Sequence, residues 1–143
     1  MLKFVITGNP CSSKNAIRSG ITKQGRNYTY TQANVKVYKD SALKQLMLQM
    51  IEYNKKFDTA RTMPEYGAEF PIDDFCQVSF IFYCIDNRKR DLCNLIQCPA
   101  DLLQQAGIIE NDYLIRSLDN SRIANVDKLQ PRTEITITIL DKE

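Results

Sequence analysis

A basic triplet is followed by acidic side chains over residues 88–112, an order that could serve phosphodiester chemistry. The triplet Arg88-Lys89-Arg90 leads directly into Asp91, and Glu110-Asn111-Asp112 follows a predicted helix. Hydrolysis of a phosphodiester needs an activated water and stabilised charge on the phosphate, and Mg²⁺ held by aspartates can supply both. The alternative is purely structural, because aspartate is also a common helix cap and turn residue.

The basic triplet is predicted to contact a phosphate backbone. Arg88, Lys89 and Arg90 directly precede an acidic position, and a polyanionic substrate must be drawn towards carboxylates that repel it. Binding through such contacts falls steeply with salt. Ordinary solvated surface is the other interpretation of the same residues.

A second basic segment lies near the N-terminus. Gly20 and Gly25 lie around the expected turns, and Tyr28 and Tyr30 follow at alternate positions, which is typical of a hairpin. Such a hairpin can follow phosphates and offer a ring to an unstacked base, although a solvated hairpin whose tyrosines pack on the sheet would give the same pattern. Its cations are candidate DNA contacts: Lys14, Arg18, Lys23 and Arg26.

Composition narrows the chemistry. The 143 residues suffice for one domain with a core, and a net charge of +2 means that any nucleic-acid surface must come from local clustering. The absence of histidine excludes Ser-His and Cys-His catalysis and histidine-ligated metals. The five cysteines are odd in number and form no Cys-x-x-Cys pair, so they predict neither a zinc site nor a disulfide framework.

The cysteines and the apolar runs also indicate where in the cell the protein is found. Several cysteines fall in core-like patterns, which indicates buried, reduced thiols. No apolar run is suited to a signal peptide or long enough for a membrane span. We therefore expect a cytoplasmic protein.

Hydrophobic periodicity predicts the elements that position these groups. Besides the hairpin, we expect strands at 2–7, 76–84, 113–118 and 132–140 and helices at 33–55 and 92–106. Asp91 should cap the second helix, Gly107 should end it, and Pro99 should bend it without a break. This order predicts an α+β fold, one domain over 1–143, with a mixed β-sheet packed with two main helices.

Two further expectations concern the first helix and the segment after it. Residues 57–74 contain Pro64, Gly67 and Pro71 and are predicted to form a long loop without an assigned role. The core face of the first helix is predicted to comprise Val35, Tyr38, Ala42, Leu46, Met50 and Tyr53, flanked by Leu43 and Met47.

Arg90-Asp91-Leu92-x-Asn94-Leu95, then Asp101, Ala106-Gly107 and the acidic group ending at Asp112, closely resemble the motif of the RusA-type Holliday-junction resolvases. Upstream, Pro10-x-x-Ser13-Lys14-Asn15 extends the likeness, which covers most of the chain. The sequence departs from the family pattern at Cys93, which replaces an aspartate, and at Gln97, which replaces a lysine.

The resemblance implies a homodimeric, Mg²⁺-dependent endodeoxyribonuclease, with Mn²⁺ as a substitute, that resolves four-way DNA junctions by paired nicks. By likeness, Asp91 and Asp112 are the metal ligands that remain, position 93 completes the catalytic set, and Gln97 lies at a DNA-contacting position. A thiol is a poor ligand for Mg²⁺, and Gln97 cannot supply a cation. The alternative is therefore a catalytically weakened or inactive protein that binds junctions or other branched DNA. A structural domain unrelated to nucleic acid is a third reading.

Helix geometry adds a prediction about the dimer. A helix from Leu92 to Ala106 is about 22 Å long at about 1.5 Å per residue. Residues 107–112 reach at most about 20 Å when fully extended. Asp112 could therefore return to Asp91 only through an almost complete reversal of the chain. A two-fold dimer in which the partner lends Asp112 is easier, and it predicts a composite site.

Overall fold

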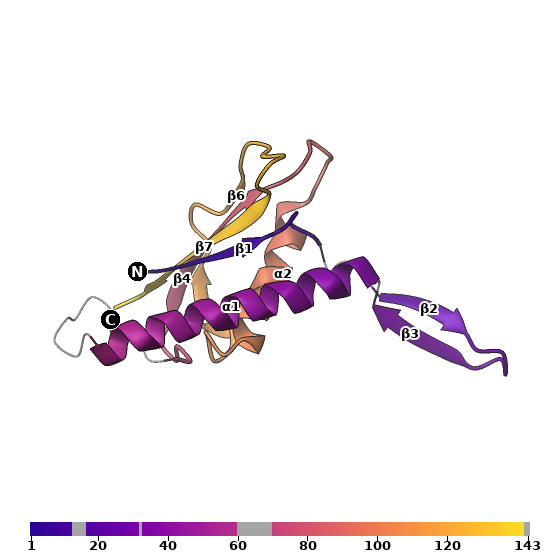
Figure 1. The fold of residues 1–143 in the computed structure, drawn as a ribbon, viewed down its shortest axis with the longest axis horizontal. Coiled ribbons are helices and arrows are strands. Elements are labelled where there is room, and N and C mark those ends of the chain that lie inside the picture. The colour runs from indigo at the N-terminus through magenta and orange to yellow at the C-terminus, as the bar shows by residue number, and fades with distance from the viewer. Residues whose placement is uncertain (13–16, 32, 60–69, 142–143) are drawn as a thin grey trace.

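The chain folds into a mixed β-sheet and two main helices (Figure 1). The computed structural model describes residues 1–12, 17–31, 33–59 and 70–141. The sheet runs in the order β1-β7-β4-β5, with β6 also paired to β4. β7 is antiparallel to β1 and β4, whereas β5 and β6 are parallel to β4. The predicted α+β fold with a mixed sheet is confirmed. Its strands are β1 (Leu2–Thr7), β4 (Cys76–Tyr83), β5 (Ile115–Ser117), β6 (Arg122–Ile123) and β7 (Arg132–Ile139).

The predicted hairpin forms a separate two-stranded sheet. β2 (Ile17–Ile21) pairs with β3 (Asn27–Thr31), and the pair leads into α1 (Ala33–Thr59). In Figure 1 the hairpin projects from the N-terminal end of α1, away from the main sheet. α2 (Leu92–Gln105) buries its apolar side in the core and contacts α1.

Alternation along the strands places one hydrophobic face in the core. In β4, the side chains of Cys76, Val78, Phe80 and Phe82 are buried while those between them are half-buried. The buried side chains of α2 join the same cluster, together with Ala42 and Leu46 of α1. These burials fix the position of α2, and those in α1 confirm the predicted core face of that helix.

The outer edge of β1 is closed by side chains of α1. Gln45, Gln49 and Tyr53 each hydrogen-bond the N–H and the C=O of one β1 residue, at Thr7, Val5 and Lys3 respectively. These three residues are four apart, so they lie on one face of the helix. The residues of β1 that they bond are two apart and point their backbone groups to the same edge. α1 thus occupies the place of a further strand.

The structure corrects three sequence expectations. α1 continues to Thr59 instead of ending at Lys55, so the predicted 57–74 loop begins later, and its residues 60–69 lie outside the described part of the chain. The predicted 113–118 strand is a 3-10 helix, η2 (Asp112–Leu114), followed by the short β5, because the Asn111 side chain accepts from the Tyr113 N–H and turns the chain. Met47 is 44% exposed, since it lies one residue round the helix from buried Leu46.

Candidate active site

Asp91 stands at the N-terminus of α2. Its Oδ1 accepts the Cys93 N–H at 2.9 Å, so the predicted cap is confirmed. Its backbone is extended, as a capping position requires. Oδ2 makes no hydrogen bond or ion pair within the described residues, which leaves one carboxylate oxygen for a ligand.

Cys93 and Gln97 share the exposed side of α2 near Asp91. Both side chains are exposed, and a spacing of four residues places them one above the other on the helix. Cys93 therefore presents its thiol where the family pattern has an aspartate. Asn94 is half-buried in the same turn.

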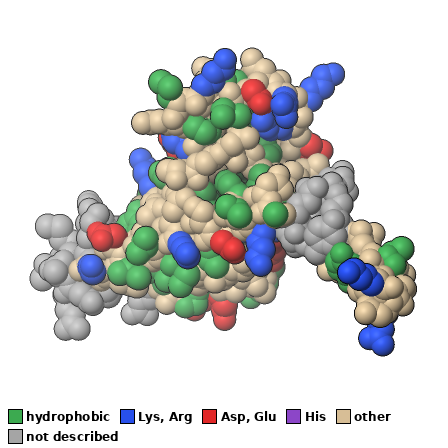
Figure 2. Space-filling view, turned by 45° about the vertical axis from the view of Figure 1, so that its right-hand side comes forward, with side chains coloured by type: hydrophobic (Ala, Val, Ile, Leu, Met, Phe, Trp, Pro, Cys, Tyr) green, Lys and Arg blue, Asp and Glu red, His purple; other side chains and the backbone are tan. Residues whose placement is uncertain are grey.

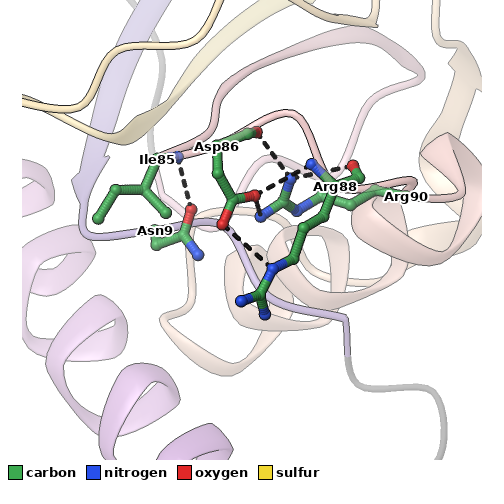
Figure 3. A network of polar contacts seen from close by, with 5 residues as sticks. All are labelled: Asn9, Ile85, Asp86, Arg88 and Arg90. Atoms are coloured by element: carbon green, nitrogen blue, oxygen red, sulfur yellow. Dashed lines mark hydrogen bonds and ion pairs between the residues drawn. The ribbon is translucent and has the colours of Figure 1, made fainter.

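The loop before Asp91 is held by an arginine. The Arg90 guanidinium donates to Asp86 Oδ1 at 2.7 Å, to the Asp86 carbonyl at 3.0 Å and to the Arg88 carbonyl at 3.2 Å (Figure 3). The Arg90 hydrogen bond, aided by the Arg88 N–H, holds the pKa of Asp86 below its usual value. Asn9, in the segment after β1, braces the loop by accepting the Ile85 N–H at 2.9 Å.

The three basic side chains of the triplet therefore differ in exposure and in bonding. The Arg88 side chain is 84% exposed and makes only a 3.4 Å ion pair with Asp86. Lys89 is exposed, with no ion pair in the described residues. Arg90 is 16% exposed, with most of its donors engaged inside the loop. Arg88 and Lys89 thus present the cationic surface beside Asp91, whereas Arg90 shapes it.

Asp112 lies at the other end of α2. Its N–H donates to Gln104 Oε1 at 3.3 Å, and its side chain is exposed. Gly107, with φ of +77°, ends the helix as predicted. The chain then pairs with Ile72 through Ile109 instead of returning along α2. Asp112 consequently stays beside the last turn of the helix.

Within one chain the two aspartates are far apart. Asp91 and Gln104 are separated by 13 helical steps, which corresponds to about 20 Å along the axis. Among the described residues, no three Cys, Asp or Glu side chains cluster in a way that could hold a metal ion. A single protomer therefore offers Mg²⁺ two separate carboxylates. Carboxylate oxygens are suitable ligands for Mg²⁺, but the two aspartates do not lie together within one chain.

The basic hairpin lies at a distance from these aspartates in sequence and projects from the body. Lys23 and Arg26 are exposed at its tip, where Thr22 and Arg26 close the turn through hydrogen bonds. Figure 2 shows lysine and arginine side chains on the hairpin with no acidic side chain beside them on that face. Lys14 lies outside the described residues, and for Arg18 only the backbone is described.

The Tyr28 ring lies across the hairpin. Tyr28 pairs with Gly20 in register, and a β-carbon at Gly20 would come within 2.6 Å of the Tyr28 hydroxyl and Cζ. Glycine is therefore needed for this close approach. The ring is still 47% exposed. Tyr28 therefore packs across the hairpin itself and stays partly exposed, whereas the structural alternative expected the tyrosines to pack on the sheet.

A cavity next to Asp112 was not predicted. It measures about 870 Å³, and within it the Arg116 guanidinium stacks over the Phe75 ring at 4.1 Å. Sequence gave no signal for it, because the walls come from three separate segments. The lining residues are Asp73, Asp74, Phe75, Tyr113, Leu114, Arg116, Leu140 and Asp141.

An acidic helix cap beside a cationic loop, on an α+β scaffold with a projecting basic hairpin, defines a nucleic-acid-processing class of protein. The family model for endodeoxyribonuclease RusA matches residues 8–138. The chain therefore belongs to the RusA family of junction-resolving endodeoxyribonucleases, and its class of partner is branched DNA. A comparison with curated proteins finds no match. Among the described helices, none has an apolar stretch long enough to cross a bilayer.

Proposed function

We propose that this protein is a Mg²⁺-dependent endonuclease that resolves four-way DNA junctions as a homodimer in the cytoplasm, with Mn²⁺ able to replace Mg²⁺. The observation that carries the proposal is Asp91, which has one carboxylate oxygen without a hydrogen bond from any described residue, beside the exposed Arg88 and Lys89. A phosphate attracted by these cations would lie next to a hard oxygen ligand. The match to the RusA family over 8–138 supports the same reading.

The metal site proposed here is composite. Asp91 of one subunit and Asp112 of the other would hold the ion, since α2 keeps the two aspartates of one chain at opposite ends. When bound, Mg²⁺ would polarise the phosphate and activate a water. Arg88 and Lys89 would orient the DNA backbone, and the hairpin cations Lys23 and Arg26 would grip it further out. A two-fold dimer suits a junction because each subunit can address one of two equivalent strands and make paired nicks.

A second function is favoured by one observation. The Cys93 thiol is exposed in the first turn of α2, where the family pattern has an aspartate. A soft sulfur ligand weakens a Mg²⁺ site, and Gln97 brings no charge to the phosphate. The alternative is therefore a protein that recognises branched DNA and cleaves it slowly or not at all.

One experiment separates the two functions. A labelled four-way junction is incubated with Mg²⁺ or Mn²⁺ and with the wild type, Cys93→Asp or Asp91→Asn. Cleavage by the wild type that Asp91→Asn abolishes supports the nuclease. Cleavage by Cys93→Asp alone supports a binding protein with a disabled site. If the wild type and Cys93→Asp both bind the junction and neither cleaves it, the nuclease proposal is contradicted. If neither binds the junction, both proposed functions are contradicted.

A further inference from the structure

One apolar side chain projects from the turn between β6 and β7. Leu129 is 94% exposed, the most exposed of the large hydrophobic side chains that the structure describes. Its neighbours Lys128 and Gln130 are exposed as well. Single apolar residues scattered over a surface are ordinary, so the meaning of Leu129 depends on how it is held and on what surrounds it.

Polar contacts within the 127–130 turn hold Leu129 in place. Asp127 Oδ1 accepts the Gln130 N–H at 3.0 Å, which closes the turn. The Arg132 guanidinium donates to Asp127 Oδ2 and to the Gln130 carbonyl, each at 2.9 Å. Leu129 is thus presented on a turn that is fixed at both ends, and such preorganisation lowers the entropy cost of binding through it.

Arg132 in turn is anchored on the main sheet. Its guanidinium lies over the Tyr83 ring, 3.9 Å from the ring centroid, and donates to Glu134 Oε1 at 2.9 Å. Tyr83 ends β4, Arg132 begins β7, and the two residues are partners in the antiparallel register. The turn that carries Leu129 is therefore tied to two neighbouring strands.

The 127–130 turn lies next to the loop that leads to Asp91. The Asp127 N–H donates to the Cys84 carbonyl at 2.9 Å, and Cys84 directly precedes that loop. In Figure 1 the segment between β6 and β7 and the loop before α2 leave the same end of the sheet. Leu129 thus stands on the side of the molecule that carries the cationic loop of the candidate active site.

The charges at this end of the sheet favour a polyanion. The carboxylates of Asp86, Asp127 and Glu134 form ion pairs with arginines. Lys89 and Lys128 are exposed and make no ion pair with any described residue. Their charges are therefore available for phosphates close to Leu129.

We propose that Leu129 is an apolar wedge that inserts between base pairs at the branch of bound DNA, while Lys89 and Lys128 contact the phosphates beside it. Leucine and other apolar side chains enter base steps in proteins that kink DNA, at a cost in base stacking. That cost is smallest where stacking is already interrupted, as at a branch. The inference rests on the proposed function for its branched-DNA partner, and it does not require cleavage.

The test measures binding of the full-length protein to a four-way junction that carries 2-aminopurine beside the branch. EDTA is present, so that metal-dependent cleavage does not occur. 2-Aminopurine fluoresces more strongly when it is unstacked, so binding of the wild type should raise the fluorescence. Leu129→Ala should lose most of this rise and bind the junction about tenfold more weakly, because the side chain no longer fills the step. Leu129→Met, which stays apolar, should keep both.

Two controls separate insertion from general effects. Leu48→Ala changes a leucine that is 65% exposed on α1 and should match the wild type in both readouts. An unbranched duplex of equal length should bind Leu129→Ala as tightly as it binds the wild type. The melting temperature of Leu129→Ala should be unchanged, since the side chain that it removes is in solvent.

Four results would overturn the wedge. If Leu129→Ala binds the junction and raises the fluorescence as the wild type does, insertion is refuted and the proposed function stands. An equal loss of affinity for the unbranched duplex would make Leu129 a general DNA contact. Conversion of a dimer to monomers by Leu129→Ala, measured by light scattering, would assign Leu129 to the subunit contact. Absence of junction binding by the wild type would contradict the proposed function together with the wedge.

Discussion

The side-chain amide of Gln49 pairs with both backbone groups of Val5, donating to its carbonyl at 2.7 Å and accepting its N–H at 2.8 Å. Gln45 and Tyr53 repeat the arrangement at Thr7 and Lys3. An unpaired strand edge is a template for association with another chain. Helix α1 removes that edge, so it stabilises the sheet by hydrogen bonds as well as by burial.

Replacement of Gln49 should therefore destabilise the sheet edge. Gln49→Met leaves the Val5 N–H and C=O without their partners, and we expect a loss of about 1–2 kcal/mol in the free energy of unfolding. Urea denaturation measures this loss. Glu52→Met, an exposed change on the same helix, is the control and should stay within about 0.5 kcal/mol of the wild type. Equal stabilities of the two variants would refute the role assigned to Gln49.

A composite site predicts complementation between inactive variants. Asp91→Asn and Asp112→Asn should each abolish cleavage alone, whereas a mixed dimer keeps one intact site formed by Asp91 of one subunit and Asp112 of the other. Co-refolded at equal amounts, the two should regain about one quarter of the wild-type nicking rate, as single nicks. Cys93→Asp supplies an active background if wild-type cleavage is slow. No recovery in verified mixed dimers would place both aspartates in one chain.

Substitutions in the basic triplet before Asp91 should affect DNA binding and protein stability separately. Arg88→Ala combined with Lys89→Ala should weaken junction binding, lower the salt slope by about 1–2, and leave the melting temperature nearly unchanged. Arg90→Ala should instead cost roughly 1–2 kcal/mol of stability, because three hydrogen bonds within the loop are lost. Fluorescence anisotropy over a salt series and thermal unfolding give the two readouts. An unchanged salt slope in the double variant would rule out these phosphate contacts.

The ion pair between Asp86 and Arg90 predicts that the stability of the protein depends on pH. The Arg90 hydrogen bond, followed by the Arg88 N–H, lowers the pKa of Asp86 in the folded state. The stabilisation by ionised Asp86 is therefore complete above the ordinary aspartate pKa of about 4 and is lost as pH falls through the lowered value. Asp86→Asn should be less stable than the wild type at pH 7, and the difference should shrink towards pH 2. Asp119→Asn, an exposed change, is the control for unfolding measured over this range. A difference that stays constant with pH would show that ionisation of Asp86 is not its source.

Local chemistry made much of this fold predictable. Asp91 caps α2 and Gly107 ends it because both signals act within one helical turn. Alternation in β4 fixed its buried face for the same reason. The 113–118 segment was misread because the Asn111 cap overrode a pattern that also suits a strand. The end of α1 was misplaced because helix ends depend on contacts that periodicity does not show.

The sequence by itself determined the motif around Asp91, the family likeness, the strands and helices of the core and the separation of the two aspartates along α2, since these depend on residue type and short-range spacing. Only the tertiary structure decided that Gln45, Gln49 and Tyr53 close the β1 edge, and that Arg90 shapes its loop while Arg88 faces solvent. Each of these contacts joins side chains whose directions are set by packing. The spacing of residues along the chain does not predict such contacts.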